Sequence, residues 1–234
     1  MELANAKALV TGGSSGIGFE TARQLRARGA QVAICGRDEA RLQKAAKELG
    51  ALGIVADVAK EEDVVQLVRT VVETFGDYDV LINNAGFGIF APLVSTRLKD
   101  MQNVYATNVF GAMLVARESA KHFITRQRGN IVNIASTAGQ RGSANGTSYS
   151  SSKFALSGLT ECWRAELRPY NIRVMQVNLS EVQTEFVVNS GRPGRGYSER
   201  KLVSADIAHT IVAMLEMHDR GFVTDATVWA TNPD

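Results

Sequence analysis

Tyr149 and Lys153 stand four positions apart, a spacing at which a phenol and an ammonium group can act together. Reduction of a carbonyl needs a hydride at carbon and a proton at oxygen, and a phenol near its free pKa of about 10 is a slow proton donor at pH 7. A neighbouring ammonium favours the phenolate and lowers that pKa. Because residues four apart share one helix face, we expect Lys153 to lower the pKa of Tyr149.

Ser136 and Asn108 are candidates to complete such a proton-transfer site. Ser136 follows the apolar run 131–134, and parallel sheets present ligands at the carboxyl ends of their strands. Its hydroxyl could bind a substrate oxygen and direct it toward Tyr149. Asn108 lies in a stretch of helical spacing, 104–116. Each residue also has an ordinary alternative: a serine that caps a turn, a tyrosine that packs, and an asparagine that is exposed.

A glycine-rich segment at 11–18, Thr-Gly-Gly-Ser-Ser-Gly-Ile-Gly, follows an apolar run and precedes a helical pattern. Glycine allows a sharp turn and lets the backbone approach a diphosphate closely. The start of the following helix offers free N–H groups and a partial positive charge to that anion. The spacing of Gly12, Gly16 and Gly18 differs from G-x-G-x-x-G, and a purely structural turn would give the same residues.

Arg37 lies where such a nucleotide site would meet the adenosine ribose. An acidic residue after the second strand would accept from a 2′-hydroxyl, but Gly36 occupies that place and Arg37 follows it. A guanidinium suits a 2′-phosphate, so the sequence predicts NADP(H) in preference to NAD(H). The alternative is that Arg37 is a solvated surface charge and that Asp38 merely caps the next helix.

Short apolar runs alternate with helical patterns along the chain. The expected strands are 8–10, 31–35, 53–56, 80–82, 131–134, 172–177 and 223–229. This alternation predicts an α/β fold: a three-layer, Rossmann-type, doubly wound sheet of about seven mainly parallel strands in a single domain, 1–234. Glycines and arginines gather at 189–200, which we interpret as a mobile loop or lid.

The composition excludes several classes of protein. The chain has 234 residues, 45% of them hydrophobic, and a net charge of +2, unlike a disordered chain or a strongly basic nucleic-acid binder. It has neither an apolar run of the roughly 18 residues that a membrane span needs nor a basic, apolar leader. The histidines are scattered, so we expect no metal. Cys35 and Cys162 lie in apolar segments, and we expect buried thiols in a cytoplasmic protein.

Several of these signatures occur together in one order. They are the segment 11–18, Asn-Asn-Ala-Gly at 83–86, Asn108, Ser136, and Tyr149-Ser-Ser-Ser-Lys153. In this order the chain resembles the short-chain dehydrogenase/reductase family, and in length and motifs its 3-oxoacyl-[acyl-carrier-protein] reductases. The resemblance implies a nicotinamide cofactor and a seven-stranded Rossmann-type sheet. The motif at 83–86 could equally be a turn that joins strands.

The resemblance also implies the roles of individual residues. Asp57 and Val58 would flank the adenine, Lys153 would hold the nicotinamide ribose, and Asn108 would anchor a water that links Lys153 to solvent. The expected catalytic residues are Asn108, Ser136, Tyr149 and Lys153. The expected cofactor-binding residues are Gly12, Ser14, Ser15, Gly16, Ile17, Gly18, Arg37, Asp57, Val58, Asn84, Ala85, Gly86, Tyr149, Lys153, Val182 and Thr184.

The segment after the sixth strand departs from the family pattern. Leu179 and Ser180 replace the usual Pro-Gly pair, although Val182 and Thr184 match. Proline fixes φ and glycine permits a positive φ, so we expect this turn to differ. The Val182 backbone and the Thr184 hydroxyl could still reach the nicotinamide carboxamide, and Glu181 would have to face solvent.

The expected substrate is a small carbonyl compound or alcohol, for which a carrier- or CoA-linked 3-oxoacyl group is the first candidate. An apolar wall is expected from Phe87, Phe90, Phe186 and Val187. Basic residues at 192, 195, 200 and 201 could meet an anionic or phosphopantetheine-bearing substrate, although a solvated loop is the favoured interpretation of Arg192, Arg195, Arg200 and Lys201.

Other functions remain as alternatives. A broad-specificity aldehyde or ketone reductase, or an alcohol dehydrogenase, belongs to the same enzyme class. A catalytically silent NADP(H)-binding sensor is the alternative from another class, and the presence of Ser136, Tyr149 and Lys153 argues against it. The family resemblance further implies a homodimer or homotetramer, paired through the apolar helices 104–123 and 154–167.

Overall fold

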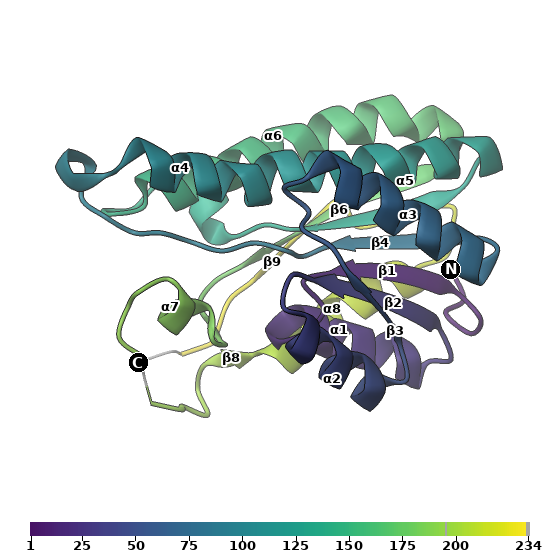
Figure 1. The fold of residues 1–234 in the computed structure, drawn as a ribbon, viewed down its shortest axis with the longest axis horizontal. Helices are drawn as coiled ribbons and strands as arrows, with labels where there is room; N and C mark the ends of the chain where they lie inside the picture. The colour runs from purple at the N-terminus through teal and green to yellow at the C-terminus, as the bar shows by residue number, and fades with distance from the viewer. Residues whose placement is uncertain (195, 233–234) are drawn as a thin grey trace.

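The computed structural model describes residues 1–194 and 196–232. Within them, seven strands form one sheet in the order β3-β2-β1-β4-β5-β6-β9, and all its pairings are parallel (Figure 1). The strands are β1 (Lys7–Thr11), β2 (Gln31–Gly36), β3 (Leu52–Val55), β4 (Val80–Asn83), β5 (Gly129–Ile134), β6 (Ile172–Leu179) and β9 (Asp225–Val228). The predicted doubly wound sheet is therefore confirmed.

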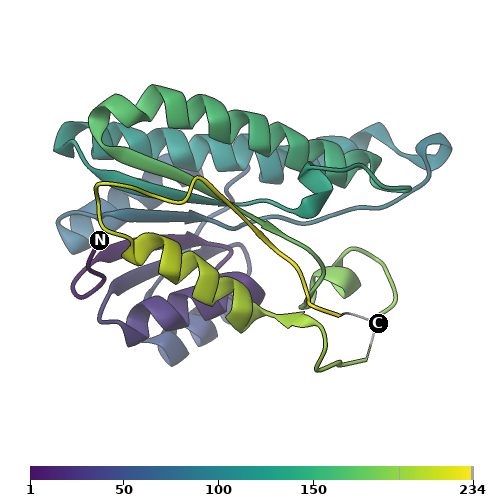
Figure 2. The same cartoon turned by 180° about the vertical axis from the view of Figure 1, so that it is seen from behind.

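Helices cover both faces of the sheet (Figures 1 and 2). One layer holds α1 (Gly16–Ala27), α2 (Glu39–Leu49) and α8 (Ser204–Glu216). The other holds α3 (Glu61–Phe75), α4 (Leu98–Tyr105), α5 (Ala112–Arg126) and α6 (Thr147–Leu167). The short elements β7 (Val182–Gln183), α7 (Phe186–Asn189) and β8 (Leu202–Val203) lie beyond the carboxyl ends of the strands.

An apolar core fills the space on each side of the sheet. Val10, Ile34 and Ile82 pack toward α1, α2 and α8, whereas Leu9 and Leu81 pack toward α3 and α5. All five side chains are fully buried. Both faces of a parallel sheet are covered in this way, which explains the nearly continuous apolar runs in the sequence.

The order of the strands creates a crevice between β1 and β4. The chain moves outward from β1 to β2 and β3, then returns to the other side of β1 and continues through β4 and β5. Loops that leave the carboxyl ends of β1 and β4 thus turn in opposite directions, and ligands of open α/β sheets bind at such a point. The glycine-rich segment and the motif at 83–86 both begin here.

Two expectations about the helical layer are wrong in detail. The predicted continuous helix over 104–123 is interrupted by a π-helix, Ala106–Gly111, between α4 and α5. Such a bulge shifts the helical register, and Asn108 within it is only 1% exposed. Cys35 is buried as expected, but Cys162 is exposed on α6, because it faces away from the sheet.

Two absences hold for residues 1–194 and 196–232. None of the helices there has the length and apolar character that crossing a membrane requires. Their His, Cys, Asp and Glu side chains form no group of three or more that could hold a metal ion.

Gly129→Ala should destabilise the fold. A Cβ at the start of β5 would lie 2.4 Å from the ring of Phe123, whose side chain is fully buried and cannot move aside. Overpacking of this kind costs about 1–3 kcal/mol, and we expect that loss in the free energy of unfolding measured with urea. Gly221→Ala is the control, since its Cβ would meet nothing within 4 Å. Equal stability of both variants would contradict the packing described here.

Candidate active site

The glycine-rich turn after β1 is bound directly to the end of β4. The Thr11 hydroxyl accepts hydrogen bonds from the backbone N–H groups of Asn84 and Ala85, both at 3.0 Å. In return, the Asn84 amide donates to the carbonyls of Thr11 (2.9 Å) and Gly12 (3.2 Å). The motif at 83–86 therefore joins two strands, as the structural alternative proposed, and it does so at the wall of the crevice.

The glycines of this turn serve different purposes. Gly12 and Gly16 have φ angles of 63° and 54°, a region that favours glycine, and both line the crevice. A Cβ on Gly18 would lie 2.4 Å from the Gly12 carbonyl oxygen, and one on Gly13 would lie 2.6 Å from Ile34. Gly18 is thus a packing residue behind the turn, not part of the crevice wall where we expected it to meet the cofactor.

The crevice is a cleft of about 860 Å³ that runs from Arg37 to Tyr149. All the expected cofactor-binding residues except Gly18 line it, namely Gly12, Ser14, Ser15, Gly16, Ile17, Arg37, Asp57, Val58, Asn84, Ala85, Gly86, Tyr149, Lys153, Val182 and Thr184. Gly16 is the first residue of α1, so the free N–H groups of that helix open onto the cleft. The volume of the cleft, the positive end of α1 and the glycines of the turn, which have no Cβ atoms, fit a dinucleotide.

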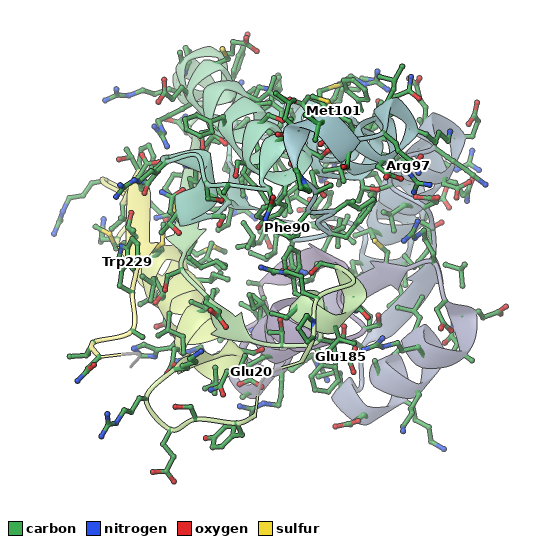
Figure 3. All side chains as sticks on the ribbon, turned by 90° about the vertical axis from the view of Figure 1, so that its left-hand side faces the viewer. Glu20, Phe90, Arg97, Met101, Glu185 and Trp229 are labelled. Atoms are coloured by element: carbon green, nitrogen blue, oxygen red, sulfur yellow. The ribbon has the colours of Figure 1, made fainter. Side chains whose placement is uncertain are left out.

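Arginines gather at one end of the cleft. Arg37 follows β2 and lines the cleft, while the Asp38 side chain accepts from the N–H of Arg41 at 3.0 Å and caps α2. Arg41 also lines the cleft and forms an ion pair with Glu185, which precedes α7 (Figure 3). The sequence interpretation missed Arg41, although its position four residues after Arg37, near the start of the expected helix, was a usable signal.

Ser136 and Tyr149 meet at the opposite end of the cleft. Ser136 follows β5, and its Oγ accepts from the Ala138 N–H at 3.1 Å and donates to the Leu179 carbonyl at 3.3 Å. Tyr149 lies in the first turn of α6 and is 7% exposed. The rings of Phe90 and Phe186 flank it, each with its centroid 5.3 Å from that of Tyr149.

Burial dominates the electrostatics of Tyr149. It raises the pKa of the phenol, while hydrogen bonding with Ser136 and the charge of Arg192 act in the lowering direction. Lys153, one turn further along α6, has its Nζ 5.9 Å from the Tyr149 ring centroid and donates to the Ile134 carbonyl at 2.8 Å. The pKa of Tyr149 is therefore raised and not lowered as we expected, because desolvation of the phenol outweighs the lowering effects, and Lys153 is not among their sources.

Lys153 is itself perturbed. Its side chain is buried, and loss of solvation lowers its pKa to about 8. No carboxylate lies within ion-pair distance of Nζ among the residues described, and the Ile134 carbonyl is its hydrogen-bond acceptor. A buried cation without an ion-pair partner is costly, which is typical of a functional site.

Asn108 lies beside this site and holds the neighbouring turn in place. Its Oδ1 accepts from the Phe87 N–H (3.0 Å), and its Nδ2 donates to the Phe87 carbonyl (2.9 Å) and to Ser152 Oγ (3.0 Å). A Cβ on Gly86 would lie 3.1 Å from Asn108 Oδ1 and 3.6 Å from Lys153 Nζ. Asn108 therefore fixes the turn after β4 against α6 and lies close to Lys153, but it does not line the cleft.

The altered segment after β6 still presents the expected residues. Leu179 continues the strand, and the Ser180 N–H donates to the Val228 carbonyl at 3.0 Å. Thr184 faces the glycine-rich turn, with its Cγ2 3.6 Å from the position of a Cβ on Gly16. Glu181 forms an ion pair with Lys201 at 3.4 Å, with its side chain partly in solvent. With Leu179 in β6 and Ser180 after it, Val182 and Thr184 still line the cleft.

The arrangement of the chain matches a known family. The model of the short-chain dehydrogenase family aligns with residues 6–193, which include the glycine-rich turn, Ser136, Tyr149 and Lys153. This chain belongs to the short-chain dehydrogenase/reductase family. The family model that matches describes short chain dehydrogenases, so the chain has the fold and the site residues of an oxidoreductase family.

Individual members of the family give the range of similarity. The chain is 38% identical to the uncharacterized oxidoreductase YxnA of Bacillus subtilis over 165 residues, 68% of this chain and 46% of that protein. It thus spans about half the length of that relative. The alcohol dehydrogenase of Thermococcus sibiricus, complexed with 5-hydroxy-NADP, is 26% identical, with a TM-score of 0.89 over 98% of this chain and 99% of its own.

A second solved structure is equally similar in fold. The 3-ketoacyl-(acyl-carrier-protein) reductase of Brucella melitensis, complexed with NADH, is 27% identical with a TM-score of 0.89, covering 97% of both chains. The two structures carry different nicotinamide nucleotides. The similarity of fold therefore does not distinguish NADP(H) from NAD(H), and the distinction depends on the residues around Arg37.

Lys153→Met should change how stability depends on pH. The unfolded protein holds the lysine proton up to a pKa near 10.5, whereas the folded protein releases it near 8. Between these values the unfolded state binds more protons, so the stability of the wild type rises with pH relative to the variant. We expect the variant's advantage in the free energy of unfolding, measured in urea at each pH, to shrink from about pH 8 upward.

The same substitution at the exposed Lys99 is the control. Lys99→Met should follow the wild type across this range. A constant difference between the wild type and Lys153→Met from pH 7 to pH 10 would mean that the Lys153 ammonium is not desolvated in the folded protein.

Proposed function

We propose that this enzyme interconverts a carbonyl and a secondary alcohol with NADP(H), using Tyr149 as the acid and base. The observation that carries the proposal is the meeting of Ser136, Tyr149 and Lys153 at one end of a cleft whose other end holds Arg37 and Arg41. A catalytically silent sensor would need the cleft but not the buried lysine, which is costly to maintain.

The residues divide the work of proton transfer. When bound, the nicotinamide supplies or accepts the hydride. Ser136 Oγ hydrogen-bonds the substrate oxygen and holds it beside the Tyr149 phenol. Because burial raises its pKa, the phenol is neutral at pH 7, the form in which it donates a proton to the oxygen during reduction. Lys153 would hold the ribose of the nucleotide, and Asn108 keeps the neighbouring turn in place.

The substrate is proposed at the level of its class. A 3-oxoacyl thioester is the first candidate, because the Brucella melitensis 3-ketoacyl reductase shares this fold over almost its whole length. Phe90, Phe186 and Val187 give the cleft an apolar wall next to Tyr149, as expected from the sequence. A broad-specificity aldehyde or ketone reductase, or an alcohol dehydrogenase, would use the same wall.

We also propose that the enzyme pairs with copies of itself through the faces of α5 and α6. Phe110, at the junction of the π-helix and α5, is 54% exposed, and Phe154 on α6 is 46% exposed. Large apolar side chains exposed on neighbouring helices favour an interface between subunits.

Tyr149→Phe tests the proposed chemistry directly. It removes the hydroxyl and keeps the ring between Phe90 and Phe186. We expect kcat for reduction of 3-oxoacyl thioesters and simple ketones to fall by about 10²–10⁴-fold, the usual contribution of a positioned proton donor. The Kd for NADPH, measured by its fluorescence, should not change. Tyr170→Phe, at an exposed tyrosine, is the control, and wild-type kcat in Tyr149→Phe would contradict the mechanism.

The nucleotide preference has its own test. With Gly36 in place of an acid and Arg37 beside it, we expect kcat/KM to be higher with NADPH than with NADH. Arg37→Ala should lower that ratio by about 10-fold or more, because a hydrogen bond to a charged group contributes roughly 1.5–3 kcal/mol. Arg97→Ala, at an exposed arginine outside the cleft, should leave the ratio unchanged. A wild-type preference for NADH would contradict the assignment.

A further inference from the structure

Arg192 stands against the substrate end of the cleft. Its Cζ lies 4.0 Å from the centroid of the Phe90 ring, and the Phe90 ring lies 5.3 Å from that of Tyr149. Both side chains line the same cleft as Tyr149, and Figure 3 shows Phe90 beside α7 at the carboxyl edge of the sheet. Guanidinium, Phe90 ring and phenol thus follow one another along one wall.

Arg192 lies in the segment that joins β7 to β8. The two strands pair with each other. The Gln183 side chain also accepts from the Ser198 N–H (2.7 Å) and donates to the Ser198 carbonyl (2.8 Å), which holds the segment to β7. Over the cleft, Phe186 packs on Tyr149. Arg192 is exposed, as the solvated loop favoured by the sequence implies, but its guanidinium also stacks on the Phe90 ring, which lines the cleft.

The other basic residues of this segment have different surroundings. Lys201 forms an ion pair with Glu181, outside the substrate end of the cleft. Arg195 lies outside the described residues. Arg192 lines the cleft together with Phe90 and Tyr149, whereas Arg200 and Lys201 do not line it.

The charge of Arg192 is not balanced by the protein within the described residues. Two carboxylates that precede this segment pair with other residues, Glu185 with Arg41 and Glu181 with Lys201. The Ser190 hydroxyl accepts one hydrogen bond from Arg192 Nε at 3.0 Å, and no described carboxylate lies within ion-pair distance of the guanidinium. A guanidinium has five N–H donors, and stacking on a ring leaves those at its edge available to a ligand.

We propose that Arg192 binds an anionic group of the substrate, so that the enzyme selects carbonyl compounds or alcohols that carry a negative charge. The planar fork of a guanidinium matches a carboxylate or a phosphate with paired hydrogen bonds. A carboxylate would belong to a short oxo acid, and a phosphate to the pantetheine arm of a thioester. The inference rests on the proposed function, since the selected molecule is the substrate of the Tyr149 site.

Two matched pairs of compounds separate the sources of the charge. The first pair is 3-oxobutanoate and its methyl ester, which differ in a carboxylate next to the reacting ketone. The second is 3-oxobutanoyl-4′-phosphopantetheine and 3-oxobutanoylpantetheine, which differ only in the phosphate. For each compound, kcat/KM with NADPH and, separately, the calorimetric Kd in the presence of NADP⁺ are measured for the wild type, Arg192→Gln, Arg192→Lys and the surface control Arg97→Gln.

In the wild type, we expect the charged member of one pair to be preferred, in both kcat/KM and Kd. Arg192→Gln should reduce that preference by about 10- to 100-fold, the usual range for a charge-assisted hydrogen-bonded contact. Arg192→Lys should retain part of it, because it keeps the charge and loses the fork. Arg97→Gln should match the wild type. A preference within the acid pair assigns the site to a carboxylate, and one confined to the thioester pair assigns it to the phosphate arm.

The remaining outcomes distinguish failure of the inference from failure of the proposed function. If the compounds turn over but neither pair shows a charge preference that depends on Arg192, the inference is overturned and the proposed function stands. If no compound turns over but the Kd of a charged member depends on Arg192, the anion site stands and the proposed function fails. If there is neither turnover nor charge-dependent binding, both are wrong.

Discussion

The hydrogen bonds between Thr11 and the turn at Asn84 and Ala85 fix the geometry on which the whole site depends. They hold the carboxyl ends of β1 and β4 together at the point where the strand order reverses. If these ends separated, the glycine-rich turn could not keep the first N–H groups of α1 facing the cleft. A single threonine hydroxyl, which accepts from two backbone N–H groups and donates to the Ile82 carbonyl, therefore connects the fold to its nucleotide site. The close approach of Gly18 to Gly12 leaves no room for the turn to relax.

The second constraint is the burial of Lys153. An ammonium group that is removed from water must be stabilised by hydrogen bonds or give up its proton. Here the Ile134 carbonyl supplies a hydrogen bond and the pKa falls to about 8, so the group remains largely charged at neutral pH at a cost in stability. The buried Lys153 ammonium lies at the end of β5, where Ser136 and Tyr149 also meet. The burial of Lys153 thus lowers the stability of the protein at the residues that we propose for proton transfer.

The sequence could predict features that depend on local pattern. Apolar runs marked the strands of the sheet, and the spacing of the glycines placed the turn after β1. Features that depend on three-dimensional packing could not be predicted in this way. The π-helix around Asn108 comes with hydrogen bonds from Asn108 to the turn at Phe87 and to Ser152 of α6. The pKa of Tyr149 is raised by burial, and the rings of Phe90 and Phe186 flank this side chain. Charge spacing alone gave the wrong direction for that pKa because it ignored desolvation.

The two ends of the cleft use arginine in contrasting ways. At the nucleotide end, Arg41 is already paired with Glu185, an acid carried by the segment that covers the cleft. If the 2′-phosphate of NADP(H) binds at Arg37, as we propose, it would share Arg41 with the Glu185 carboxylate or displace that carboxylate. At the substrate end, Arg192 on the same segment has no described carboxylate partner and rests on Phe90. Because one short stretch, from Glu185 to Arg192, carries both contacts, charge at either end of the cleft acts on the same piece of chain.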